Sequence, residues 1–184
     1  MIRNLKAKLN ALSTAPSVPQ TPPQTICFMR ETASPLMDFP GLTTLSEAHI
    51  RRLCDVEVAQ DWDIRRTLFL DTETTGLRGA GTVAFLIGVG FVQDEGFVVR
   101  QLLMRDYPEE PALLEELAQL LPRFDRVVTF NGKSFDIPLL RDRFTMARLR
   151  ARWRELPQLD LMHPSRRVWR LRLQNCRLSN LEGA

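Results

Sequence analysis

Short apolar runs separated by turn residues mark the middle of the chain. Residues 67–70 (TLFL) form one such run, which ends at Asp71, and longer apolar runs follow at 83–92 and 97–104. Runs of this length bounded by turn signals predict buried strands. The sequence Asp-Glu-Gly at 94–96 lies between the last two runs and predicts a hairpin. We therefore expect a meander of three strands.

The segments that follow alternate between helix and strand patterns. Residues 111–124 carry five leucines on one helical face, namely Leu113, Leu114, Leu117, Leu120 and Leu121. Residues 126–130 and 159–162 have the composition of strands, and residues 138–152 have that of a helix opened by proline. Three strands followed by βα units predict an α/β fold with a mixed sheet flanked by helices.

The first third of the chain has a different character. Residues 2–12 have the spacing of a short amphipathic helix, and residues 13–40 are rich in Pro, Thr, Ser and Gln. This composition is typical of an extended linker or arm rather than packed structure. Residues 45–60 show helical spacing again. The sequence thus predicts an N-terminal arm with a short helix over 1–65 and a folded domain over 66–184.

Composition narrows the environment in which the protein works. No apolar run is long enough to span a bilayer, and charged residues interrupt the N-terminus, which lacks the apolar core of a signal peptide. The three cysteines lie far apart, so the sequence contains neither a zinc-knuckle pattern nor a disulfide framework. We expect a cytoplasmic protein without a membrane partner.

The positive charge of the protein is unevenly distributed. The net charge is only +3, yet residues 141–180 hold eleven arginines against three acids, a local net charge of +8. The planar guanidinium group suits bidentate contacts with phosphate. This stretch is therefore either a surface for a polyanionic partner such as nucleic acid or a solvated helix face.

Asp71 and Glu73 form the first candidate site. They are two residues apart at the end of a predicted strand, so both side chains project to the same side of the sheet. Two carboxylates in this position repel each other and lose hydration, and a divalent cation bound by both relieves these costs. The alternative is turn chemistry, in which Asp71 ends the strand and the sequence Thr-Thr-Gly at 74–76 turns the chain.

The second candidate site is the segment at 131–136 (NGKSFD), which directly follows a predicted strand. Asp136 precedes Ile137 and Pro138, so it has the position of a helix cap, and the Asn-Gly pair at 131–132 is typical of a turn. A capping carboxylate keeps one oxygen free, so capping and metal binding are compatible.

These two segments resemble the first and second motifs of the DnaQ-like DEDD 3′-5′ exonuclease superfamily. The first is FLDTETTGL at 69–77, and the second is the segment at 131–136. Within that superfamily the chain resembles the YprB-like ribonuclease-H-like family, over about residues 66–182. Residues 81–90, 130–140 and 160–167 carry this closer resemblance. The resemblance implies a ribonuclease-H-like fold.

The resemblance also implies a metal centre. Asp71, Glu73 and Asp136 match three of the four acidic ligands that hold two Mg²⁺ or Mn²⁺ ions in the superfamily. By this correspondence Asp71 would bridge both metals and Glu73 would hold the metal that activates water. Asp136 would help to anchor the second metal.

Five further positions correspond to substrate-binding residues of the family. Thr74, Gly76 and Leu77 fall where the family's loop packs against the terminal nucleotide. Asn131 and Lys133 would face the phosphate backbone, although Lys133 is also compatible with a solvated loop lysine.

The third motif of the family is where this chain departs from the pattern. That motif supplies a fourth aspartate, with a His or Tyr nearby, on a later helix, and the chain ends at Ala184 before this point. We therefore expect a C-terminally truncated domain. Asp160 resembles a strand aspartate rather than the fourth ligand. His163 is either a stand-in for the water-activating base or a residue that packs beside Pro164.

Three functional hypotheses follow. The first is a metal-dependent nuclease, a 3′-5′ exonuclease that cleaves DNA or RNA by a two-metal mechanism, with arginines of the 141–180 stretch along the nucleic-acid backbone. The second is a non-catalytic nucleic-acid-binding module with an incomplete site. The third is a scaffold whose Pro-rich arm docks onto a partner. The sequence sets no oligomeric state.

Overall fold

A six-stranded mixed sheet forms the centre of the computed structural model, which describes residues 27–54, 59–76, 81–151 and 156–181. The strands are β1 (Phe28–Pro35), β2 (Thr67–Thr74), β3 (Ala84–Gln93), β4 (Gly96–Leu103), β5 (Arg126–Thr129) and β6 (Gln158–Asp160). Their order across the sheet is β1-β4-β3-β2-β5-β6. In this order, the neighbouring pairs from β1 to β2 are antiparallel, and the pairs from β2 through β5 to β6 are parallel. The predicted α/β fold with a mixed sheet is confirmed.

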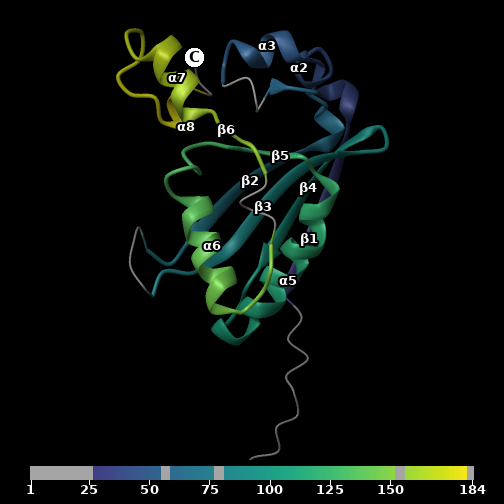
Figure 1. Cartoon of the computed structure of the whole chain (residues 1–184), viewed down its shortest axis with the longest axis vertical. Helices are drawn as coiled ribbons and strands as arrows, with labels where there is room; N and C mark the ends of the chain where they lie inside the picture. Colours follow the sequence, from purple (N-terminus) through teal and green to yellow (C-terminus); the bar gives the residue numbers. More distant parts are fainter. Residues whose placement is uncertain (1–26, 55–58, 77–80, 152–155, 182–184) are drawn as a thin grey trace, which may run out of the picture.

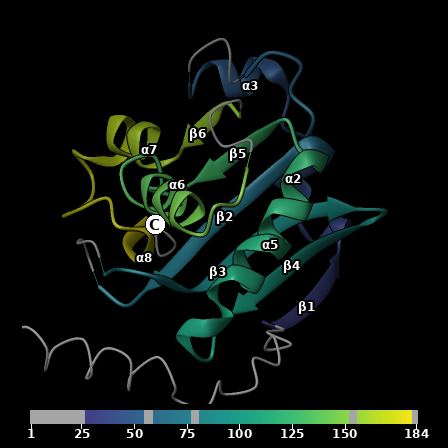
Figure 2. The ribbon, with the colours of Figure 1, turned by 60° about the horizontal axis from the view of Figure 1, so that its bottom comes forward.

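Two helices cover one face of this sheet. They are α5 (Glu110–Leu120) and α6 (Asp136–Met146), and Figures 1 and 2 show them side by side against the strands. Further helices bounded within the described residues are α2 (Pro40–Thr43), α3 (Glu47–Arg51), α7 (Met162–Trp169) and α8 (Leu178–Leu181). The 3-10 turns there are η1 (Leu36–Asp38), η2 (Ile64–Arg66), η3 (Tyr107–Glu109) and η4 (Leu121–Arg123). Among the described residues, no helix is long and apolar enough to cross a membrane.

The main core lies between the sheet and the helices α5 and α6. The five leucines predicted to share a helical face, which α5 and the following turn carry, are all buried there, and Ile137, Leu140 and Phe144 of α6 join them. Leu68 and Leu70 face this core from β2. Burial of each such side chain contributes roughly 1.5–3 kcal/mol, so this face holds the domain together.

The opposite face of the sheet is covered over β2, β5 and β6, and Phe39, which follows η1, packs on Phe97 of β4. A smaller cluster there joins Ile50 and Ala59 to Val128 and Leu159, with Phe69 of β2 at its margin. Farther across, the same face is open, since Phe28 is 50% exposed and Val99 is 39% exposed. We call the part of this face formed by β1, β4, β3 and the end of β2 the open face.

The arm predicted over residues 13–40 is wrong for its last part. Residues 28–35 form β1, which pairs along its whole length with β4. The first six residues of β1 are all exposed, so the sequence shows no alternation of apolar and polar positions that would predict a strand. Backbone hydrogen bonds to β4 hold it in place instead. The predicted helix at 2–12 lies outside the described residues.

Helix ends also differ from the sequence-based expectations. The helix predicted to reach residue 152 ends at Met146, because Arg148 adopts a left-handed backbone conformation with φ of 58°. Of the helix expected within residues 45–60, the structure shows α3, which Ser46 and His49 cap reciprocally, whereas residues 55–58 lie outside the described residues. No helix was predicted at the position of α7, whose arginine-rich sequence buries only Pro164.

Candidate metal centre

The carboxylates of Asp71 and Glu73 lie on the open face at the end of β2. Buried and exposed residues alternate along this strand. Leu70 and Thr72 are buried toward α6, and the residues that follow each of them, Asp71 and Glu73, are exposed. The strand alternation therefore directs both acids to the same side, as predicted. The turn interpretation is wrong for Asp71, because β2 continues through Thr74.

A glycine on the neighbouring strand keeps the space beside Asp71 free. Gly88 of β3 is the direct partner of Asp71 in the sheet. A Cβ atom added at Gly88 would find only the Asp71 carbonyl oxygen nearby, at 3.9 Å. The packing of the protein therefore does not require glycine at position 88. The glycine leaves an open surface next to the carboxylate of Asp71.

The acidic pair is electrostatically uncompensated. Although Asp71 is exposed, the surrounding protein partly desolvates its carboxylate, which raises the pKa of Asp71, and the neighbouring charge of Glu73 raises it further. Within the described part of the chain, neither side chain takes part in an ion pair. An uncompensated pair of oxygen ligands has the chemistry that Mg²⁺ or Mn²⁺ prefers.

Asp136 reaches the end of β2 from the other side. It is 4% exposed, and its carboxylate accepts a hydrogen bond from the hydroxyl of Thr72. Burial raises the pKa of Asp136, the Thr72 hydroxyl opposes this shift, and the charges of Asp71 and Asp160 add to it. The predicted capping role is not what the structure shows, because α6 begins at Asp136 itself without a side-chain cap.

The loop that carries Asp136 has a tightly determined backbone. Asn131 adopts a left-handed conformation with φ of 66°, which asparagine tolerates better than most residues. At Gly132, an added Cβ would lie 2.5 Å from the Cβ of Thr129. Only glycine fits there, so the turn predicted from the Asn-Gly pair is confirmed and has a steric cause.

Asp160 fixes the same loop from β6. Its carboxylate accepts hydrogen bonds from the backbone N–H groups of Asn131 at 2.7 Å, Lys133 at 3.1 Å and Met162 at 3.0 Å. The side chain is buried. Asp160 is thus a structural acid that ties the loop before α6 to the start of α7, in agreement with its interpretation as a strand aspartate.

The three predicted metal ligands do not form one ready-made cage. Among the described residues, no group of three or more His, Cys, Asp and Glu side chains is arranged so that it could hold a metal ion. Asp71 and Glu73 lie together on the open face, and Asp136 lies on the α6 side of the strand, bonded to Thr72. The oxygen-donor chemistry fits a divalent cation at the Asp71–Glu73 pair.

The loop after β2 holds two of the predicted substrate-binding residues. The hydroxyl of Thr74 donates to the carbonyl of Gly76 at 2.8 Å, which closes the turn upon itself. The backbone N–H of Thr75 donates to the carbonyl of Val83, and the Thr75 hydroxyl accepts from the backbone N–H of Val83. Leu77 lies outside the described residues.

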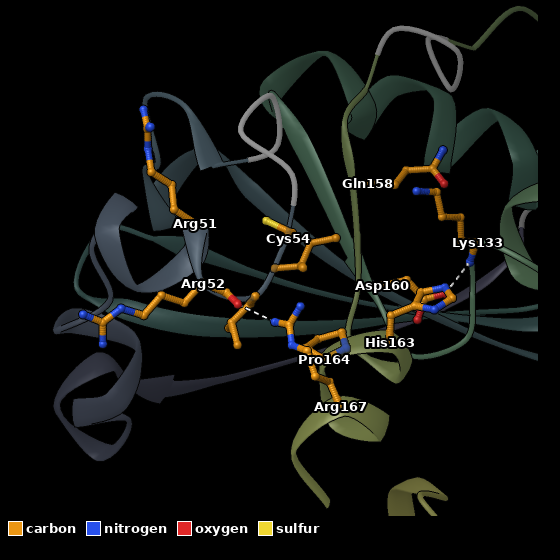
Figure 3. A pocket seen from close by; sticks show the side chains of 11 residues that line it. Arg51, Arg52, Cys54, Lys133, Gln158, Asp160, His163, Pro164 and Arg167 are labelled. Atoms are coloured by element: carbon orange, nitrogen blue, oxygen red, sulfur yellow. Dashed lines mark hydrogen bonds between the residues drawn. The ribbon is translucent and has the colours of Figure 1, made fainter. Parts of the chain in front are cut away.

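Of the remaining predicted residues, Lys133 borders a separate pocket and Asn131 does not line it. Lys133 and His163 line a cavity of about 360 Å³ between α3, β6 and α7, together with Asp160 and Arg167. Figure 3 shows this arrangement. The lining includes none of the three candidate ligands. Sequence reasoning placed Arg167 within a broad basic stretch, and only the fold selects it from the other arginines.

One arginine of that stretch has a structural role instead. Arg143 of α6 forms an ion pair with Glu110 at the start of α5, and both side chains are largely buried. This contact joins the two helices that cover the sheet. Arg143 is therefore not part of a surface for nucleic acid.

The mixed sheet, with helices on both sides and acids at the end of β2, is the architecture of a ribonuclease-H-like domain. The chain belongs to the RNase H superfamily, whose family model matches residues 68–184. It is similar to the uncharacterized protein YprB of Bacillus subtilis (strain 168), with 32% identity over 167 residues. That alignment covers 85% of this chain and 40% of YprB, so the chain spans less than half of its relative's length.

Proposed function

We propose that this protein is a divalent-metal-dependent nuclease of the DEDD type that removes nucleotides from the 3′ end of DNA or RNA. The observation that carries the proposal is the Asp71–Glu73 pair, two carboxylates on an open face without an ion pair in the described part of the chain. Membership of the RNase H superfamily supports a nuclease-like function.

Each residue of the centre has a distinct task in this proposal. Mg²⁺ or Mn²⁺ ions, when bound, supply charge neutralisation at the scissile phosphate and activation of water in a two-metal mechanism. Asp71 and Glu73 hold them from β2. Asp136 contributes from the start of α6, in a position set by Thr72. Gly88 leaves room for the sugar-phosphate backbone beside Asp71.

A cleavage assay tests the proposal. Oligonucleotides labelled at the 5′ end would be incubated with the full chain and Mn²⁺, then with Mg²⁺. A ladder of products shortened from the 3′ end is expected, and a blocked 3′ end should prevent it. Asp71→Asn and Glu73→Gln should each lower the rate about 100-fold or more, because each removes a ligand charge.

Glu95→Gln is the matched control. Glu95 is an exposed acid at the β3–β4 hairpin, so its loss should leave the rate unchanged. Equal rates for the wild type and Asp71→Asn would contradict the assignment of the site. Products from internal cleavage would contradict the exonuclease mode while retaining a nuclease.

A second function is favoured by one observation. The described residues contain no group of three potential ligands placed for a metal, which is the expectation for a non-catalytic module that binds nucleic acid. Binding of single-stranded oligonucleotides with a steep salt dependence, combined with an absence of cleavage in Mn²⁺, would select this function over the first.

A further inference from the structure

The cavity between α3, β6 and α7 is basic. Four cationic side chains line it, those of Arg51, Arg52, Lys133 and Arg167, and His163 stands beside them. These residues come from three segments that are far apart in the sequence. Figure 3 shows the ends of Lys133, His163 and Arg167 around the same opening, whereas the guanidinium groups of Arg51 and Arg52 point away from it.

Positive charge outweighs negative charge in the lining, although Arg51 is paired with Glu47. Asp160 is the single acid of the lining, and three backbone N–H groups orient its carboxylate without cancelling its charge. Arg167 donates to the backbone carbonyl of Arg52, which orients its guanidinium group without cancelling its charge. Lys133 forms no ion pair within the described residues. An anion is the ligand that such a lining selects.

Apolar residues form the smaller part of the lining. They are Leu53, Leu159 and Pro164, and the last two are buried. A volume of about 360 Å³ lies at the lower end of the range for small-ligand sites. Cationic side chains together with the imidazole of His163, on which a base can stack, match a phosphate joined to a base.

We propose that this cavity binds one nucleotide of a single-stranded nucleic acid substrate, with its phosphate between Lys133 and Arg167. The inference rests on the proposed nuclease function for its biological meaning. The loop at 131–136 connects the two sites, since Lys133 lines the cavity and Asp136 follows three residues later beside β2. A strand bound here would lie on the loop that leads to Asp136. A nucleotide in a duplex is paired and stacked, so its base cannot enter the cavity.

Binding without cleavage provides the test. Fluorescence anisotropy of a labelled oligothymidylate of about twelve nucleotides would be measured in EDTA, so that no turnover takes place. Arg167→Gln and Lys133→Gln should each weaken binding about three- to tenfold and lower the salt slope by about one. Lys133→Gln removes no side-chain hydrogen bond recorded in the described part of the chain. It therefore separates lost binding from lost folding.

Arg166→Gln is the matched comparison, because Arg166 is the exposed neighbour of Arg167 on α7 and does not line the cavity. It should weaken binding less than twofold. Equal weakening by Arg166→Gln and Arg167→Gln would overturn the proposal in favour of a diffuse basic surface. Thymidine monophosphate binding as tightly as the oligonucleotide would also overturn it, as would equal affinity for a duplex.

The two proposals fail in different experiments. If Mn²⁺ supports no cleavage but binding still depends on Lys133 and Arg167, the nuclease function is wrong and the cavity remains a nucleic-acid site. If cleavage is normal and both variants bind like the wild type, the cavity assignment alone is wrong.

Discussion

The hydroxyl of Thr72 donates a hydrogen bond to the buried carboxylate of Asp136, which joins the end of β2 to the first turn of α6. Thr72 stands between Asp71 and Glu73 in the sequence but points to the opposite face of the sheet. A single strand thus presents two acids to the open face and holds a third through its intervening residue.

Replacing Thr72 tests this contact. Thr72→Val keeps the shape of the side chain but leaves the buried Asp136 without its hydroxyl donor, so the free energy of unfolding should fall by about 1–3 kcal/mol. The pKa of Asp136 should rise further, because the hydroxyl opposes the effect of burial. Urea denaturation measures the first effect. Thr72→Ser retains the hydroxyl, so its free energy of unfolding should fall less. Equal losses of stability in both variants would argue against the contact.

The raised pKa of Asp71 predicts a pH-dependent cost. Burial and Glu73 disfavour the ionised carboxylate in the folded state. The folded protein therefore binds a proton more tightly than the unfolded chain, and stability falls as the pH rises from the ordinary value of 3.8 through the raised one. In EDTA, Asp71→Asn should melt at a higher temperature than the wild type at neutral pH. This advantage should shrink as the pH approaches 4.

Metal addition should reverse that order. Mn²⁺ bound by the folded state raises the melting temperature of the wild type by mass action. Asp71→Asn, which lacks one ligand charge, should gain much less. Differential scanning fluorimetry with and without Mn²⁺ measures both effects, and an equal gain in the two proteins would place the metal elsewhere.

Asp160→Asn should loosen the loop before α6. The amide cannot accept all three backbone N–H groups that the carboxylate binds, so the free energy of unfolding should fall by about 1.5–3 kcal/mol. Hydrogen exchange at the amides of Asn131 and Lys133 should accelerate as well. Asp106→Asn is the control, because the Asp106 carboxylate accepts from the backbone of Tyr107 at an exposed site. A similar small loss in both variants would contradict the bracing role of Asp160.

Gly88→Val separates folding from function. The added side chain meets little of the protein and suits a strand, so the free energy of unfolding should change by less than about 1 kcal/mol. It would nevertheless cover the surface beside Asp71, and we expect the cleavage rate to fall more than tenfold. Thr32→Val places the same valine side chain on β1, two strands away from Gly88, and should leave cleavage intact. Retained activity in Gly88→Val would show that this space is not used.

Much of the fold was predictable from local patterns. The leucines at 113–121 and the apolar runs of β2, β3 and β4 are repeated signals, so helix, meander and core follow from them. Strand β1 was not predicted, because both of its sides are exposed and its pairing depends on β4, some seventy residues later. The early end of α6 was not predicted, because Arg148, rather than the expected glycine, adopts the left-handed conformation after the helix.

The candidate centre was predictable in its parts but not in its assembly. The spacing of Asp71 and Glu73 determines that they share a face, since strand geometry has a period of two. The sequence could not show that Asp136 approaches from the α6 side and bonds to Thr72, because that contact joins residues 64 positions apart. The same limit applies to Arg167, which only the packing of α7 against α3 brings to the cavity with Lys133.

The pairing of β1 with β4 has a practical consequence for work on this protein. The part of the chain that matches the RNase H superfamily begins at Leu68 and so leaves out β1. A fragment cut to that match would expose the long outer edge of β4, with eight backbone positions stripped of their partner strand. Such edges recruit other chains and promote aggregation. A shortened protein that stays monodisperse should therefore start no later than Cys27.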